Sequence, residues 1–571
     1  MSDASQESDE SDGSDGTTLW LLGDRLNPPA DALDRADDVL LVESHGFAAR
    51  RRYHAHKLTL VFSAMRHCRD RLRDRGHDVT YLRADAFGEA LDEYLDDHPA
   101  GTPRLRTSRP TTDRAAERLR ELVRERGGTL EFRPDDRFLT DRADWRAFAG
   151  DDRDSDRTYR QEGWYRHVRR EHDILLADKG DGADSGDGDL KPLGGEWNYD
   201  DLNRETPPDD WEPPAPQRFD PDELTRETHR WVVETFETWG ESSLDGFGWP
   251  VTPAEATAAL DDFIRRRLPS FGRYQDAMVG GEPFVSHSLL SPALNLGLLG
   301  PQEVVDAVET AYAERGVEPG AYDPVRDGTP AAGTTATLDE FGGGADERDD
   351  GHPPIPLNAA EGFLRQVVGW REFVRHVYRE RMPEMAAANQ LDQTRDLPSA
   401  FWDGETEMRC LSEAVDHVRD FGYAHHIDRL MVLSNVALLY GTEPAELNEW
   451  FHLGFVDAFH WVTTPNVVGM GSFGTDALST KPYASSGNYV NRMSDHCADC
   501  PYAVSRTTGD DACPLNALYW DFLAEKEQQL RDTGRMGLMY SHLDDKREAG
   551  DLPAIRERAA ALREGLRNGE V

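Results

Sequence analysis

TLWLLG (18–23) and DVLLVES (38–44) are two short apolar segments bounded by turn residues, and they decide the fold of the first part of the chain. Three more segments of this kind follow, DVTYLRA (78–84), PRLRTSRP (103–110) and GTLEFRP (128–134). Helical patterns separate them, at about 54–75, 87–96 and 113–126. Because strands that alternate with helices pair in parallel, the sequence predicts an α/β domain with a doubly wound parallel sheet over residues 17–140.

The turn after the first segment indicates what this sheet could bind. GDRLN (23–27) stands where a G-x-G-x-x-G loop would mark a dinucleotide site, so no standard site of that kind is expected. Ligands of such sheets lie at the carboxyl ends of the strands. This rule places residues 23–26 and Glu43 near a bound small molecule, although they could equally be ordinary loop residues.

The rest of the chain divides into a tail, a connector and a helical region. Residues 1–16 form an acidic Ser/Gly tail that we expect to be disordered. A connector with acidic inserts spans 141–250, and its segment PLGGEWNYDDLNRETPP (192–208) has the composition of a structured, functional loop. A large all-α domain is expected over 251–571, with an acidic surface insert at about 324–352.

Acidic residues dominate the composition. The formal net charge is -44, from 108 acidic against 64 basic residues. Such charge repels itself, but at molar salt the Debye length is only ~3 Å. We therefore expect a cytoplasmic protein of a salt-in halophile, the alternative being an acidic mesophilic protein. No apolar run approaches the ~18 residues of a membrane span, so no membrane association is expected.

Four cysteines occur in the C-terminal half, Cys410 alone and three in CADCPYAVSRTTGDDACP (497–514). The fifth, Cys68, is remote in sequence. Four thiolates suit a [4Fe–4S] cluster or a structural zinc ion. Zinc ligands usually come as two close pairs, whereas Cys410 stands alone, and a Cys-Pro such as 513–514 often closes an iron–sulfur ligand set. The spacing favours iron–sulfur and leaves zinc open.

Three further patterns have a functional and an ordinary interpretation. Ser288 and Ser291 in HSLLSPALNLG (287–297) could cradle a pyrophosphate at a helix N-terminus or simply cap the helix. His425 and His426 are adjacent, so on a helix they face different directions, and one could be a proton donor or a packed side chain. The tryptophans of the helical region could be core residues or electron carriers.

Several motifs occur together and in order: GDRL (23–26), FSAMRH (62–67), GGEWNYDDLNR (194–204), SLLSP (288–292), WREF (370–373), YAHHIDRLM (423–431), KPYASSGNY (481–489) and the four cysteines. With them the chain resembles the cryptochrome/photolyase superfamily, specifically the iron–sulfur bacterial branch that contains the prokaryotic (6-4) photolyases and related cryptochromes. The resemblance covers nearly all of the chain except the tail and the acidic inserts.

The resemblance implies FAD in the helical domain, a [4Fe–4S] cluster and a 6,7-dimethyl-8-ribityllumazine antenna in the α/β domain, with Mg²⁺ as a further candidate. Carried over by position, the FAD residues are Tyr274, Ser288, Leu290, Ser291, Gln366, Arg371 and Asp457. The cluster ligands are Cys410, Cys497, Cys500 and Cys513. The antenna residues are Asp24 and Glu43, the electron carriers Trp450 and Trp402 with Tyr489 near them, and the lesion-facing residues Asp200, Arg204 and Tyr483. His426, with His425 beside it, matches the active-site histidine.

The function that this resemblance implies is a light-driven lyase acting on UV-damaged DNA, with the pyrimidine (6-4) pyrimidone as the favoured lesion and a monomer as the expected state. A photoreceptor of the same fold without repair activity is one alternative. A flavin-free iron–sulfur nucleic-acid-binding protein of the primase large-subunit type is another. Thr463 departs from relatives that carry a carboxylate or amide near flavin N5, which leaves the redox poise open. Candidate DNA contacts are Arg106, Arg109, Arg160, Arg166, Arg169, Arg170 and Arg204.

Overall fold

The computed structural model describes residues 16–98, 103–150, 158–177, 190–208, 211–327, 352–533 and 535–571. The predicted tail, apart from Gly16, and nearly all of the acidic inserts lie outside these residues. Within the described part, no helix is both long and apolar enough to cross a membrane.

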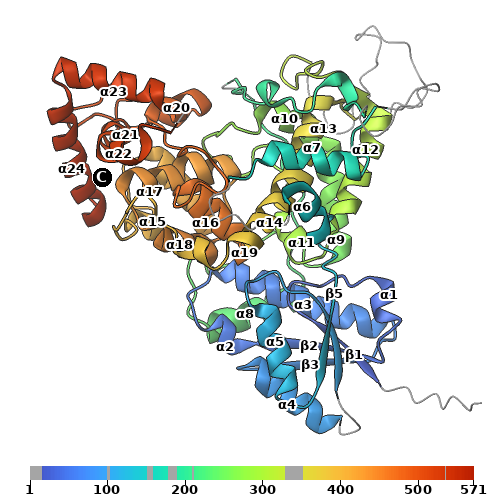
Figure 1. The fold of residues 1–571 in the computed structure, drawn as a ribbon. Helices are drawn as coiled ribbons and strands as arrows, with labels where there is room; N and C mark the ends of the chain where they lie inside the picture. The colour runs from blue at the N-terminus through green and yellow to red at the C-terminus, as the bar shows by residue number, and fades with distance from the viewer. Residues whose placement is uncertain are drawn as a thin grey trace, which may run out of the picture.

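Five parallel strands form the sheet of the N-terminal domain (Figure 1). They are β1 (Thr17–Leu21), β2 (Asp38–Ser44), β3 (Val79–Ala84), β4 (Arg104–Ser108) and β5 (Thr129–Arg133), in the order β3-β2-β1-β4-β5. Leu19 pairs with Val39 on one side and Arg106 on the other. The predicted doubly wound sheet is therefore confirmed.

Helices bury both faces of this sheet, as parallel sheets require. Leu19 and Leu41 pack with α3 (Ala55–Asp74), whereas Trp20 and Leu40 pack with α4 (Phe87–Asp97) and α5 (Ala115–Arg124). The short helices α1 (Ala30–Leu33) and α2 (His45–Ala48) follow β1 and β2. Leu19 and Trp20 are neighbours that point to opposite faces, which explains why the strands read as continuous apolar runs.

The region of the predicted connector contacts both domains, because its two halves pack on different ones. Trp145 of α6 (Arg142–Ala149) stacks on His376 of the helical domain at 5.0 Å. Next come α7 (Gln161–Glu171) and the turns η1 (Leu193–Gly195) and η2 (Asp200–Leu202). The helix α8 (Glu223–Thr235) returns to the sheet domain, where His229 is hydrogen-bonded to Thr59 of α3 at 3.0 Å.

The predicted helical region is confirmed. Its first half contains α9 (Pro253–Asp262), η3 (Phe263–Arg267), α10 (Leu268–Tyr274), α11 (Ser291–Asn295), α12 (Pro301–Arg315), a two-residue pair of strands β6 (Gly316–Val317) and β7 (Ile355–Pro356), α13 (Leu357–Leu364), η5 (Arg365–Arg371), α14 (Glu372–Arg381) and η6 (Glu384–Ala387). Its second half contains α15 (Ala400–Asp403), α16 (Arg409–Phe421), η7 (Asp428–Ser434), α17 (Asn435–Tyr440), α18 (Pro444–Gly454), α19 (His460–Thr464), η8 (Pro465–Gly471), α20 (Gly487–Met493), η9 (His496–Ala498), α21 (Pro514–Glu525), α22 (Glu527–Leu530), α23 (Gly537–Ala549) and α24 (Leu552–Asn568). The segments η3, η5, η7 and η8 are π-helical, a geometry frequent at functional sites.

A buried arginine joins the two domains. The guanidinium group of Arg137, just after β5, donates to Asp24 at 3.0 Å and Asp135 at 3.0 Å in the sheet domain. It also donates to the backbone carbonyl of Asn295 in the helical domain at 2.8 Å. Arg371 of η5 donates back to the carbonyl of Arg137 at 2.7 Å, so the contact runs in both directions.

A second junction forms where α3 begins. Lys57 is buried and donates to the carbonyls of His452 at 2.5 Å and Ala458 at 2.7 Å. His54 binds the carbonyl of Arg419 at 2.9 Å, and His56 binds that of Ser243 at 2.8 Å. Both rings therefore donate to carbonyl oxygens, and both are withdrawn from water.

The burial of these histidines predicts that the protein loses stability in acid. Burial lowers the pKa of His56 to about 4, so the unfolded chain takes up a proton below pH ~6.5 that the folded chain refuses. The unfolding free energy should fall between pH 6.5 and 4, by up to about 3 kcal/mol from this residue. His56→Gln, which keeps a donor for Ser243, should flatten that slope in urea titrations. His542→Gln, at a half-exposed ring, is the control, and an equal slope in His56→Gln would contradict this account.

Candidate active site and cysteine cluster

Asp457 joins two distant segments of the helical domain, α11 and η7. Ser291, the first residue of α11, donates to its carboxylate at 2.7 Å, and Arg429 of η7 donates to both oxygens at 3.1 and 3.0 Å. Asn295 donates to its backbone carbonyl at 2.9 Å. The Arg429 guanidinium also covers the ring of Phe455 at 4.3 Å. Of the predicted FAD residues, Ser291 and Asp457 are thus in direct contact.

Arg371 lies against the same group. It is 3.2 Å from the carbonyl of Leu294 and 3.4 Å from the side chain of Asn295, which links it to Asp457. Its guanidinium lies over Phe138 at 4.4 Å and Trp461 at 5.2 Å. Burial lowers the pKa of Arg371 to about 9. Arg371 Nε and Trp461 Nε1 are buried without a hydrogen-bond partner, so unpaired donors lie here.

The other predicted FAD residues make local contacts. Tyr274, at the end of α10, packs on Trp211 with ring centroids 4.7 Å apart. Gln366 of η5 donates to the carbonyl of Gly362 at 3.3 Å. Ser288 accepts a long 3.5 Å hydrogen bond from the amide of Leu290 just before α11, whose N-terminus has no side-chain capping hydrogen bond. Thr463 is buried in α19.

The adjacent histidines point in different directions. The ring of His425 is buried, lies 3.2 Å from Asp428 and stacks in parallel on His287 at 4.7 Å. Burial lowers the pKa of His425 to about 4. The side chain of His426 is 45% exposed, with Nδ1 3.1 Å from His287 Nε2 and Nε2 3.4 Å from Asp276. Only His426 can meet a ligand from solvent.

His287 fixes the hydrogen bonding of His426. Its Nδ1 lies 3.2 Å from the carbonyl of Phe284, which can only accept, so Nδ1 carries a proton. Burial lowers the pKa of His287 well below its usual value, so Nε2 is bare and accepts from His426 Nδ1. His426 thus lies between two acceptors, His287 and the Asp276 carboxylate.

His287 and Asp276 were not predicted as site residues, although both stand in or next to the motifs quoted above. His287 directly precedes Ser288, and Asp276 lies two residues after Tyr274. Their role comes from hydrogen bonds to His426, which lies more than a hundred residues away in the chain, and no local sequence pattern predicts such contacts.

Polar side chains continue from His426 toward the long loop. Burial, with a contribution from the Asp276 carboxylate, raises the pKa of Tyr489 to about 12, and Arg204 acts on the same phenol. Burial also raises the pKa of Tyr483, the Asp200 carboxylate raises it further, and the Arg204 guanidinium opposes both effects. Asp200 is paired with Arg204 and with Arg365, the latter at 2.9 Å. The charges of the Asp200–Arg204 pair therefore reach Tyr483, and the charge of Arg204 also reaches Tyr489.

The predicted antenna carboxylates already have protein partners. Glu43 is fully buried and accepts from Arg66 at 2.9 Å and from Tyr81. Asp24 pairs with Arg25 at 2.7 Å and with Arg137 at 3.0 Å. The loop after β1 packs on the helical domain, where the amide of Leu26 donates to the carbonyl of Leu296 at 3.0 Å. The carboxyl end of β1 is therefore covered by protein.

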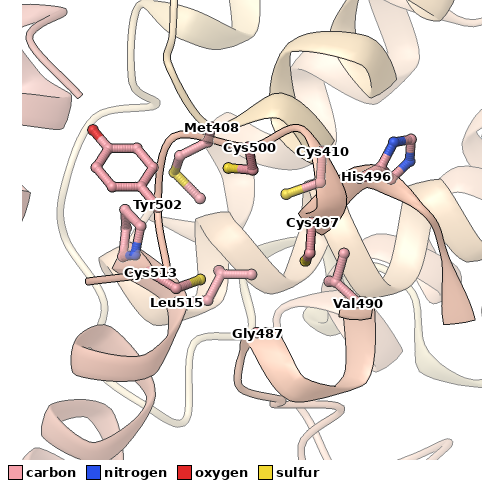
Figure 2. A pocket seen from close by; sticks show the side chains of 11 residues that line it. Met408, Cys410, Gly487, Val490, His496, Cys497, Cys500, Tyr502, Cys513 and Leu515 are labelled. Carbon is pink, nitrogen blue, oxygen red and sulfur yellow. The ribbon is translucent and has the colours of Figure 1, made fainter. Parts of the chain in front are cut away.

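The four predicted cluster cysteines line one pocket (Figure 2). Cys410 comes from α16, Cys497 from η9, Cys500 from the next loop, and Cys513 directly precedes α21. A Cβ atom at Gly487 of α20 would lie 2.6 Å from the Cys513 sulfur, so glycine leaves room for that side chain. Within the described residues, no three Cys, His, Asp or Glu side chains converge closely enough to hold a single metal ion.

Comparisons with known proteins agree with these features. Residues 19–249 match the family model "Deoxyribodipyrimidine photo-lyase-related protein". A (6-4) photolyase of Agrobacterium fabrum is 35% identical over 534 residues, which cover 91% of this chain and 94% of that protein.

Two solved structures share the fold. A class III photolyase of Agrobacterium tumefaciens has TM-score 0.51 and 17% identity, over 84% of this chain and 86% of that one. A cryptochrome of Synechocystis has TM-score 0.51 and 14% identity, over 90% and 93%.

The Asp457–Arg429 pair predicts a specific stability effect. Asp457→Asn leaves Arg429, 24% exposed, without its charged partner, so the unfolding free energy should fall by about 2 kcal/mol, less than for a fully buried pair. Urea titration of the flavin-free protein measures this. Glu121→Gln breaks an exposed pair with Arg124 and should change nothing measurable. An equally small effect of Asp457→Asn would contradict the structural role.

Proposed function

Because this chain belongs to the cryptochrome/photolyase superfamily, we propose that it is a light-dependent DNA lyase acting on the pyrimidine (6-4) pyrimidone photoproduct. One observation carries the proposal: the exposed imidazole of His426, held between two acceptors, stands beside the polar group of Asp276, Tyr489 and Arg204. A (6-4) photolyase as the 35% identical relative supports the same lesion.

The residues around Asp457 suit FAD. Unpaired buried donors on Arg371 and Trp461, with hydroxyls from Ser288 and Ser291 at the start of α11, fit a ligand with phosphate and ring carbonyl oxygens. Reduced FAD, when bound, supplies the electron that opens the lesion. Arg429 and Asp457 keep a compensated charge pair beside that site, which fixes their orientation without net charge.

The chain's own residues hold the flipped base and move the proton. A damaged, poorly stacked base costs least to flip out. Arg204 and Tyr483 would hold this base, and Arg365 would keep Asp200 in place through their ion pair. His426 Nε2 donates a proton to the lesion, while His426 Nδ1 remains hydrogen-bonded to His287 Nε2.

The contact with DNA must overcome a net charge of -44. The guanidinium group of Arg170 lies over Trp197 of the long loop at 4.4 Å, and that of Arg166 at 6.0 Å, which gives a local basic and aromatic patch. Arg169 is wrong as a DNA contact, because it is buried and donates to the carbonyls of Ile174 and Leu175. We assign the phosphate contacts to Arg160, Arg166, Arg170 and Arg204.

The four cysteines favour a [4Fe–4S] cluster over zinc. They line a shared pocket instead of converging on one point, which suits a multi-atom cluster better than a single tetrahedral ion. The cluster would join α16 to the loop before α21, so its role is structural.

A ribolumazine antenna in the sheet domain, Mg²⁺ as a further cofactor, a monomeric state and a salt-in cytosol complete the proposal. Glu43 and Asp24 are already paired with buried arginines, so neither offers the antenna an uncompensated carboxylate.

The proposal predicts light-dependent repair. Photoreduced protein, illuminated in molar salt, should remove (6-4) lesions from an oligonucleotide, and His426→Ala should slow this about 10²–10⁴-fold because the proton donor is lost. Chromatography of the lesion measures repair, and His542→Gln is the control. Flavin-loaded protein that repairs neither (6-4) nor cyclobutane lesions would be a photoreceptor, and protein without flavin would favour the primase-like alternative.

The proposed cluster predicts that the protein contains iron and that it loses stability when a cluster ligand is removed. Anaerobically purified protein should contain iron and sulfide, and Cys500→Ala should lower the melting temperature by at least about 5 °C because α16 and the loop separate. Cys68→Ala, at a buried cysteine outside the pocket, controls for loss of a thiol. Zinc without iron would decide for the other metal, and an unchanged melting temperature would refute the structural role.

A further inference from the structure

Trp239 lies between the two tryptophans that the sequence analysis singled out. Its ring contacts that of Trp402 with centroids 5.6 Å apart and that of Trp450 with centroids 6.0 Å apart. Both contacts are edge-on, with interplanar angles of 81° and 67°. Trp239 belongs to the segment between α8 and α9, far in sequence from both neighbours.

The position of Trp239 is fixed on every side. Its amide donates to the carbonyl of Tyr53, and its carbonyl accepts from the amide of Ala55, both at 3.1 Å. Its indole Nε1 donates to the carbonyl of Trp402 at 3.2 Å. A Cβ atom at Gly454 would lie 2.9 Å from its ring, so glycine there admits the indole.

The three indoles run from the interior to the surface. Trp450 is 0% exposed, Trp239 9% and Trp402 38%. At the inner end, Trp450 contacts Phe455 at 5.8 Å, and Phe455 is covered by Arg429, the partner of Asp457. The row therefore begins one aromatic ring from the candidate flavin site and ends in water.

We propose that Trp239 is the middle electron carrier between Trp402 and Trp450 in the photoreduction of the bound flavin. The inference rests on the proposed function, since it requires FAD as the light-excited oxidant. One electron passes from Trp450 to the flavin, Trp239 refills Trp450, and Trp402 refills Trp239. The oxidised Trp402 loses its indole proton to water, and an external thiol later returns one electron and one proton.

The hydrogen bonds of the indole groups favour this order of electron transfers. Trp450 Nε1 donates to the carbonyl of Phe401 at 2.9 Å, as Trp239 does to that of Trp402. An amide carbonyl is too weak a base to take the proton, so oxidised Trp450 and Trp239 remain cations and pass the charge outward. Water stabilises a charge better than the protein interior does, which favours the last step to Trp402.

The test compares three single variants under blue light with a thiol. Trp239→Phe should slow flavin photoreduction on the order of tenfold. By flash absorption, the tryptophan radical should live longest in the wild type, less long in Trp402→Phe, which ends the row at Trp239, and shortest in Trp239→Phe. Trp520→Phe, at a tryptophan that Lys546 covers at 4.9 Å, should behave as wild type.

Flavin content and melting temperature of each variant show that the fold is kept. Wild-type photoreduction and radical lifetime in Trp239→Phe would overturn the inference. If Trp239→Phe fails to fold, Trp402→Phe decides, because a radical as long-lived as in the wild type would exclude this row. Wild-type protein without flavin would instead overturn the proposed function, so the two failures are distinguishable.

Discussion

Arg137 lies buried between the sheet domain and the helical domain, and its guanidinium group has partners in both. The Asp135 carboxylate holds the pKa of Arg137 above its usual value against the effect of burial. Removing one member of such a network would leave a buried charge unpaired, which costs about 3–5 kcal/mol. The network also ends at Asn295, which binds Arg371 and Asp457, so the domain junction and the candidate flavin site share side chains.

The candidate site likewise depends on contacts between segments that are distant in sequence. Asp457 is held by Ser291 and Arg429, and His426 by His287 and Asp276. Each pair joins segments that are far apart in the chain. A shift of either helical half would therefore disturb the candidate flavin site and the candidate proton donor together. Arg429, which binds Asp457, lies in the π-helical segment η7.

The sheet could be predicted from sequence because its signal is local: apolar segments such as 38–44 recur between helical patterns. The grouping of the four cysteines around one pocket could be predicted because residue type and spacing are typical of a ligand set. Trp239 and His287 could not, since an isolated tryptophan or histidine is ambiguous until its neighbours across the fold are known. The prediction of Arg169 as a DNA contact was wrong for the same reason. Exposed and buried arginines look alike in sequence, and only the structure shows that Arg169 is buried and binds backbone carbonyls.

The rigid junction has an optical consequence. Lys57, His54 and Arg137 fix the sheet domain against the helical domain through hydrogen bonds to backbone carbonyls, which cannot rotate away as side chains can. Excitation transfer between two dyes depends steeply on their separation and on the angle between their transition dipoles. For chromophores bound one in each domain, both quantities would depend on this junction as well as on the two pockets. Mutations at the junction would therefore change the efficiency of excitation transfer without altering a residue that contacts a chromophore.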